Sequence, residues 1–151
     1  MIRHAFLAGL LGLATASTAW AADMIHKTSP HSVAETIDRL AAAVEGAGAT
    51  VFARVDHAAG AANVEMELRP TQMLMFGNPK LGTPAMLDGQ SAGLDLPLRV
   101  VAYEDAEGVV HVVYHDPASF AAAHDLPADA QYIQMMTGAL DKLTTAATAA
   151  E

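Results

Sequence analysis

Apolar residues at helical spacing predict two amphipathic helices, one near each end of the chain. Over residues 33–45 the apolar positions are Val33, Ile37, Leu40 and Val44. Ser32 precedes this run in the S-x-x-E pattern of a helix start, and glycines follow it as a stop. A second helix is predicted over residues 129–147, where the apolar stripe consists of Tyr132, Ile133, Met136, Leu140 and Leu143.

Period-two and short apolar runs predict the strands of a sheet between these helices. Residues 50–57 alternate in the manner of a half-buried strand, and residues 73–76 are continuously apolar, which predicts a strand covered on both faces. Residues 98–105 and 109–115 predict a hairpin in which Asp105 opposes Val109. A strand at 23–28 and a short helix at 117–123 complete an α+β order of elements.

The predicted hairpin has two chemically different faces. One face carries Val100, Ala102, Val112 and Tyr114 and is assigned to the core. The second face mixes apolar, aromatic and basic side chains, namely Arg99, Val101, Tyr103, His111, Val113 and His115. This mixture is typical of a ligand surface or a subunit interface, so Arg99, Tyr103, His111 and His115 are candidate ligand-binding residues.

Residues 1–21 have the pattern of a secretory signal peptide. Arg3 and His4 precede an apolar run at 5–14, and Ala19-Trp20-Ala21 forms an A-x-A cleavage site. We therefore expect cleavage near Ala21-Ala22 and a mature single domain over residues 22–151, located in the periplasm or secreted. Later apolar runs are too short to cross a bilayer, so we expect no membrane insertion after cleavage.

Charge and cysteine content exclude several classes of function. The chain has 17 acidic and 8 basic residues, a formal net charge of -9, and no cysteine. So acidic a surface repels phosphate backbones and anionic headgroups, which argues against nucleic acid and membrane surfaces as partners. The absence of cysteine excludes disulfides and a thiol nucleophile.

The segment FGNPKLGTPAM, residues 76–86, is predicted to be a loop. Residues 77–82 fit G-x-x-x-x-G, but Thr83-Pro84 occupy the places of the lysine and hydroxyl residue of a phosphate loop. Pro79 and Pro84 also remove amide donors, so phosphate binding is disfavoured. We interpret Gly77 and Gly82 as permitting unusual backbone angles and Asn78-Pro79 as setting the turn. Asn78 and Lys80 are the side chains available to a ligand.

The residues do not identify a catalytic group. His57 follows Asp56 in a predicted strand, where neighbours point to opposite faces, so the pair is no general base; His57 is kept as a candidate ligand-binding residue. An enzyme of unknown reaction is a third hypothesis, resting on polar residues beside the glycine-rich segment.

Methionine and histidine pairs suggest an alternative function in copper or other soft-metal binding. These pairs are Met24 and His26, Met73 and Met75, and Met135 and Met136, whose thioethers and imidazoles suit Cu(I). His111 and His115 lie ~13 Å apart on one strand face, which is too far to bind one ion unaided.

Taken together, FGNPKLGTPAM, ELRPTQMLM, LDLPLRVVAYEDAEG, VVYHDP and VFARVDHAAGA resemble the family known as domain of unknown function 302. The resemblance implies a compact α+β domain similar to the TATA-binding-protein-like arrangement, with helices on one face of an antiparallel sheet of four to five strands, and a homodimer. It implies no activity, and no catalytic residue carries over. The family positions matched here are Phe76, Gly77, Asn78, Pro79, Gly82, Pro97 and Tyr114.

These observations favour a non-enzymatic, exported domain without a cofactor. We expect it to bind a small molecule or a periplasmic protein through the second hairpin face and residues 76–86, and to act as a homodimer.

Overall fold

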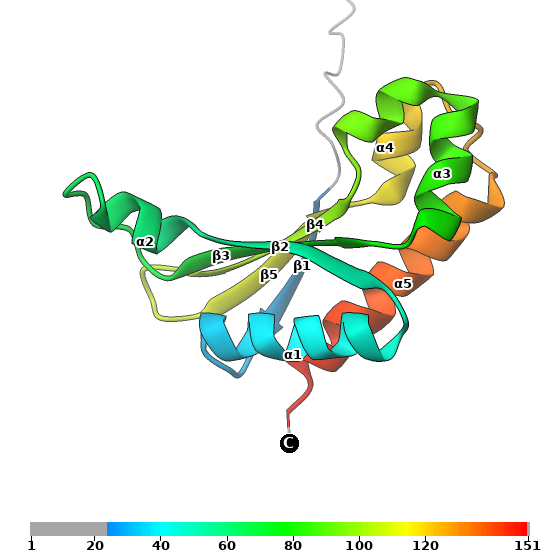
Figure 1. Ribbon diagram of the computed structural model, residues 1–151. Coiled ribbons are helices and arrows are strands. Elements are labelled where there is room, and N and C mark those ends of the chain that lie inside the picture. The colour runs from blue at the N-terminus through cyan, green and yellow to red at the C-terminus, as the bar shows by residue number, and fades with distance from the viewer. Residues whose placement is uncertain (1–23, 151) are drawn as a thin grey trace, which may run out of the picture.

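The computed structural model describes residues 24–150, so the signal peptide predicted over residues 1–21 lies outside the described residues. Five antiparallel strands form one sheet in the order β1-β5-β4-β3-β2 (Figure 1). The strands are β1 (Met24–Ser29), β2 (Thr50–Asp56), β3 (Thr71–Gly77), β4 (Leu98–Glu104) and β5 (Val110–His115). The α+β fold class predicted from the sequence is confirmed.

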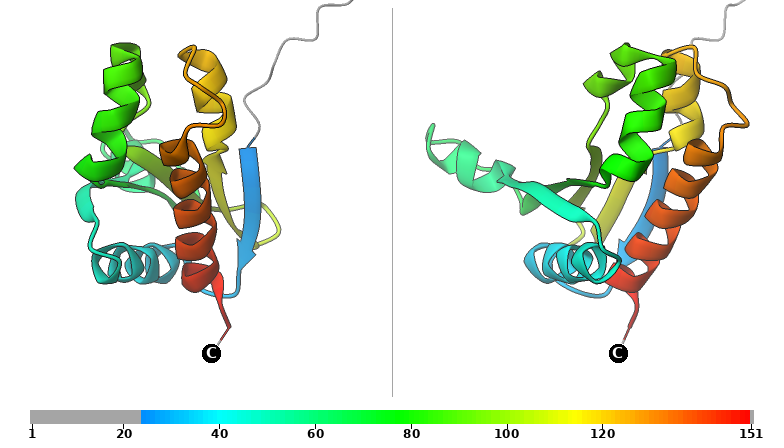
Figure 2. Two further views of the ribbon diagram at one scale, coloured as in Figure 1. Left: turned by 90° about the vertical axis from the view of Figure 1, so that its right-hand side faces the viewer. Right: turned by 45° about the vertical axis from the view of Figure 1, so that its right-hand side comes forward.

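Two long helices, α1 (Val33–Gly46) and α5 (Gln131–Thr148), cover one face of this sheet (Figures 1 and 2). Their buried stripes pack on the buried side chains of the strands, among them Leu74, Val100 and Val112. The predicted start of α1 is confirmed, because the Ser32 hydroxyl accepts a hydrogen bond from the Glu35 amide at 3.2 Å. The main core therefore lies between the sheet and these two helices.

A second, smaller core forms beyond one end of the sheet. It contains α3 (Pro79–Asp88), the 3-10 helix η1 (Gln90–Leu94), α4 (Pro117–Ala123) and the first half of α5 (Figure 2). On the opposite side of the molecule, α2 (His57–Ala62) projects from the sheet as a short arm (Figure 1). Within residues 24–150 we find no helix that is both long and apolar enough to span a membrane.

No helix of residues 24–150 covers the face of the sheet opposite α1 and α5, which is here called the open face (Figure 1). The predicted hairpin register is confirmed: Val101 pairs with Val113, Ala102 with Val112 and Tyr103 with His111. One register row runs across the whole sheet on the open face. It consists of His26, Val113, Val101, Met73 and Val55.

Two expectations about strands are wrong. Residues 73–76 were expected to be covered on both faces, but only Leu74 and Phe76 are buried, whereas Met73 and Met75 point to the half-exposed open face. The regular alternation expected for residues 50–57 is interrupted by a bulge, because Val51 pairs with Phe76 and Ala53 with Met75. Phe52 is therefore the extra residue, and its side chain is 55% exposed.

Candidate functional site

The segment predicted to be a loop after β3 is a helix, α3. The Asn78 side chain accepts a hydrogen bond from the Lys80 amide at 2.9 Å, and Pro79 stands at the first helical position. Asparagine is a favoured helix cap, and a proline at the first position loses no helical hydrogen bond. Asn78-Pro79 thus starts a helix where the sequence was interpreted as a turn, and Pro84 is accommodated within it.

Gly77 and Gly82 do not adopt the unusual backbone angles expected of them. Among the described glycines, only Gly48 and Gly108 have positive φ. A Cβ at Gly77 would instead lie 3.6 Å from the Phe52 ring, and one at Gly82 would lie 3.6 Å from Cδ1 of Leu96. These glycines therefore leave space between segments instead of bending the chain.

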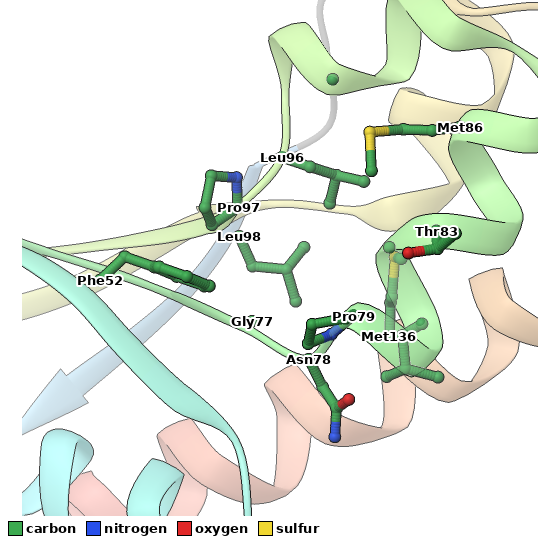
Figure 3. A pocket seen from close by; sticks show the side chains of 13 residues that line it. Phe52, Gly77, Asn78, Pro79, Thr83, Met86, Leu96, Pro97, Leu98 and Met136 are labelled. Atoms are coloured by element: carbon green, nitrogen blue, oxygen red, sulfur yellow. The ribbon is translucent and has the colours of Figure 1, made fainter.

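That space is a cavity of about 230 Å³, here called the signature cavity (Figure 3). Its walls come from β2, from the end of β3, from α3, from residues 93–98 and from α5. Among residues 24–150, only Asn78 and Thr83 contribute polar side chains to it. The full lining is Phe52, Gly77, Asn78, Pro79, Leu81, Gly82, Thr83, Met86, Gly93, Leu96, Pro97, Leu98 and Met136. Such an apolar pocket with a few polar groups is the usual form of a small-molecule site.

A second cavity of about 230 Å³ brings together two predicted residues, Arg99 and His115. Asp95 also lines it, and its carboxylate accepts hydrogen bonds from Arg99 Nη2 at 2.6 Å and His124 Nε2 at 2.7 Å. The His124 hydrogen bond, assisted by the Arg99 charge, lowers the pKa of Asp95. The Arg99 side chain that lines this cavity is therefore already paired with the Asp95 carboxylate.

The predicted pair Tyr103 and His111 lies elsewhere on the open face. Their rings stack with centroids 5.1 Å apart, and His111 Nε2 lies 2.7 Å from Asp105 Oδ2. This hydrogen bond is the main reason that the pKa of Asp105 is lowered. The pair is thus engaged with the hairpin turn and is separate from both cavities.

The remaining candidates, His57 and Lys80, are not gathered into a site. His57 begins α2 and is exposed, and Lys80 is exposed in the first turn of α3. Neither residue lines the signature cavity or the Arg99 cavity. Of the seven predicted residues, only Asn78 contributes to the signature cavity.

The open face carries several methionine and histidine side chains whose sulfur and nitrogen atoms suit a soft metal ion. Met24 pairs with His115 across β1 and β5, and His26 follows two residues later on the same face as Met24. Within residues 24–150, no three His, Cys, Asp or Glu side chains are grouped so as to hold a metal ion. Copper binding stays a prediction, and its candidate ligands are now Met24, His26 and His115.

One constellation was missed from the sequence. The sequence was interpreted as having no G-x-S-x-G motif and no serine beside a plausible base, which is wrong. Residues 89–93 have the pattern G-x-S-x-G, and the hydroxyl of Ser91 lies 2.9 Å from Nδ1 of His124. The motif was visible in the sequence. The partner histidine was not, because it lies 33 residues away and meets Ser91 only through the packing of η1 against α4.

A protein of known structure shares this architecture. A DUF302 protein of unknown function from Bacillus stearothermophilus has a similar crystal structure, with a TM-score of 0.74 at 17% identity over 82% of this chain and 97% of that chain. This likeness shows the shared fold.

The curated relatives are longer proteins named fluoride-specific ion channels. FluC 1 of Brucella suis is 47% identical over 112 residues, which are 73% of this chain and 44% of that protein. FluC 1 of Brucella abortus and FluC 2 of Brucella melitensis are also 47% identical, over 42% of their length. The chain thus spans less than half of these relatives. The family model for the domain of unknown function DUF302 matches residues 25–143, and the chain belongs to this family.

Proposed function

We propose that this protein is an exported module that binds a small apolar ligand in the signature cavity. The observation that carries the proposal is the identity of the lining. Five of the seven matched family positions, namely Gly77, Asn78, Pro79, Gly82 and Pro97, border this one cavity. The other two lie in the main core. Most family positions therefore coincide with a pocket and not merely with a bend.

The size and lining of the cavity define the class of ligand. A cavity of about 150 Å³ can hold benzene, whereas drug-sized ligands fill cavities of roughly 300 Å³ and more. At about 230 Å³, the signature cavity suits a ligand between these sizes. Its apolar part would contact Met86, Leu96 and Met136, and a single polar group would face Asn78 or Thr83.

Thermal-shift measurements with straight-chain primary alcohols of increasing length test the proposal. Each added methylene contributes about 0.8 kcal/mol on burial, so the rise in Tm should grow with chain length. It should stop growing once the chain exceeds the cavity. A series without any rise, or one that continues far beyond the capacity of the cavity, would count against the proposal.

Gly82→Leu supplies the matched test of location, because its side chain would occupy the cavity beside Leu96. Gly138→Leu is the control, since a Cβ at Gly138 in α5 meets nothing within 4 Å. We expect the first variant to lose the alcohol-induced shift and the second to keep it. Equal shifts in both variants would place binding outside the signature cavity.

We also propose that the protein forms a homodimer through the open face. The row through Val55, Met73, Val101 and Val113 gives this face a half-exposed apolar centre. The side chains sharing the open face in β1, β3, β4 and β5 include no carboxylate, although the chain has a net charge of -9. A second copy could therefore approach here with the least mutual repulsion.

Copper binding is a second candidate, favoured by the Met24–His115 pair on adjacent strands. Directly opposed residues of antiparallel strands have Cβ atoms about 4.5–5.5 Å apart, so a thioether and an imidazole can reach one Cu(I) ion. We expect stoichiometric Cu(I) uptake that Met24→Leu together with His115→Phe abolishes. Unchanged uptake in this double variant, or none in the unmodified protein, would exclude the site.

Because the relatives are named fluoride-specific ion channels, fluoride is a ligand whose binding should be compared with that of the alcohols. Fluoride would favour the cavity beside Arg99, whose lining includes basic side chains, over the signature cavity, whose lining has none. A thermal shift caused by fluoride but not by chloride, together with no response to alcohols, would replace our proposal with anion binding. We expect a thermal shift caused by alcohols and none that is specific to fluoride.

A further inference from the structure

Ser91, His124 and Asp95 form a continuous hydrogen-bonded chain that joins η1 to the end of α4. The Ser91 hydroxyl lies 2.9 Å from Nδ1 of His124, and Nε2 of His124 lies 2.7 Å from Oδ2 of Asp95. An ionised carboxylate can only accept, so the Nε2–H group donates the hydrogen bond to Asp95. In the neutral imidazole Nδ1 then carries no proton, and it accepts the hydrogen bond from the Ser91 hydroxyl.

Gly89, the first glycine of the G-x-S-x-G motif, is tightly packed, whereas Gly93, the second, has ordinary van der Waals space. A Cβ at Gly89 would lie 2.9 Å from Cδ2 of Leu126 and 3.3 Å from the carbonyl oxygen of His124. A Cβ at Gly93 would lie 3.4 Å from Sδ of Met86. Gly89 therefore permits the backbone before Ser91 to approach the backbone of His124, so motif and geometry support each other.

The surroundings shield the histidine while leaving the serine accessible. The His124 side chain is only 6% exposed, and its ring meets the Phe120 ring at an interplanar angle of 60°. The second oxygen of Asp95 is held by Arg99 at 2.6 Å, which fixes the carboxylate. Ser91 itself is exposed, and Leu94, one 3-10 turn later, is 80% exposed.

We propose that Ser91, His124 and Asp95 form an acyl-transfer centre that hydrolyses small esters with an apolar acyl group. Ser91 is the nucleophile, His124 is the general base, and Asp95 is a positioning residue that holds the imidazole tautomer. The exposed Leu94 offers apolar surface for the acyl chain. This site is distinct from the signature cavity, whose lining includes none of the three residues.

The reaction has two steps, each of which balances. In the first, Nδ1 of His124 takes the Ser91 proton, Oγ bonds to the ester carbonyl carbon, and the departing alcohol oxygen receives that proton. In the second, water gives a proton to Nδ1 and its oxygen attacks the acyl carbon. The bond to Ser91 breaks, Oγ regains the proton, and the carboxylic acid leaves. No oxidant or further reactant is required.

This centre differs from the familiar serine triads in two respects. In chymotrypsin-like triads, Nε2 faces the serine and Nδ1 faces the carboxylate, whereas here the two nitrogens exchange roles. The serine also follows α3 and stands on a 3-10 helix, instead of on a strand-to-helix turn. Removal of the serine proton requires an unprotonated nitrogen that faces the hydroxyl, and either ring nitrogen can supply it.

Labelling of the full protein with a fluorophosphonate, located by mass spectrometry of peptides, tests the proposal. We expect an adduct on Ser91, with His124→Gln slowing its formation by about 100-fold, the lower range for a lost general base. Gln90→Ala, a neighbour on the same 3-10 helix, is the control and should label at the unmodified rate. Thermal melting of each variant confirms that the labelled protein is folded.

Three further variants keep the test decisive if His124→Gln does not fold. Asp95→Asn should slow labelling because an amide can donate to Nε2 and so reverse the tautomer, and Gly89→Ala should slow it by displacing His124. Hydrolysis of p-nitrophenyl butyrate should be lost in Ser91→Ala. The absence of an adduct on Ser91 in the folded protein would overturn the proposal. So would labelling slowed less than about tenfold by loss of the base.

Discussion

Gly77 and Pro97 approach each other across the signature cavity, where a Cβ at position 77 would lie 3.7 Å from the Pro97 Cβ. That distance is an ordinary van der Waals contact, so Gly77→Ala should fold normally while its methyl group takes up part of the cavity. We expect the longest alcohol that still increases the Tm shift to shorten by about one carbon. An unchanged chain-length limit would mean that the bound chain does not pass Gly77.

The same Gly→Ala substitution should have opposite effects at two positions. Gly108 closes the β4–β5 hairpin with φ of +80°, so Gly108→Ala should lower the free energy of unfolding by about 1–2 kcal/mol. Gly138 lies within α5 with open space around it, so Gly138→Ala should raise this free energy by about 0.5–1 kcal/mol. Urea unfolding measures both changes, and effects of equal sign would contradict the structure.

Tyr132 should make stability depend on pH in the alkaline range. Burial, and secondarily its hydrogen bond to Asp88 at 2.8 Å, raise the pKa of Tyr132 to about 12. An unfolded tyrosine ionises near pH 10, so this contribution is complete below about pH 10 and is lost as the pH rises toward about 12.

Urea unfolding at several pH values across this window tests the linkage. Tyr132→Phe should be less stable than the unmodified protein at neutral pH, because Asp88 loses its partner. The difference between the two proteins should shrink as the pH rises from about 10 to about 12. A constant difference across the window would show that Tyr132 is not the group responsible.

Dimer formation through the open face predicts a charge-sensitive interface. Val101→Glu places a carboxylate in the apolar row, facing its own copy in a two-fold dimer, and should produce a monomer in light scattering. Leu87→Glu is the control, because Leu87 is 81% exposed on α3 and does not belong to the strand row of the open face. A monomeric unmodified protein, or a Val101→Glu protein that remains dimeric, would contradict the proposal.

Periodicity predicted those elements that bury one continuous side. The stripe of α5 and the β4–β5 register could be derived because a shift of one residue would place Val100 and Val112 in solvent. Asn78-Pro79 was misinterpreted because the same pair of residues suits both a turn and a helix start. The sequence did not predict that one side of β3 belongs to the open face, because an apolar run does not reveal whether a helix covers its second side.

The cavities could not be derived from the sequence, since their walls meet only in the folded chain. Phe52 comes from the edge strand, Pro97 immediately precedes β4, and Met136 lies in the last helix, so no local pattern links them. Ser91 and His124 are likewise joined by packing. The local sequence does show the glycine spacing around residues 77–82 and 89–93. These glycines allow close approach of segments and do not adopt unusual φ.

The most direct test of ligand binding in the signature cavity is NMR chemical-shift mapping during titration with a medium-chain primary alcohol. We predict the largest amide shifts at the residues of the lining, above all Gly77, Leu81, Gly82 and Gly93. Residues of the open face such as Val113 should change little. Saturable shifts centred on the open face, or no saturable shifts at the lining, would contradict the account.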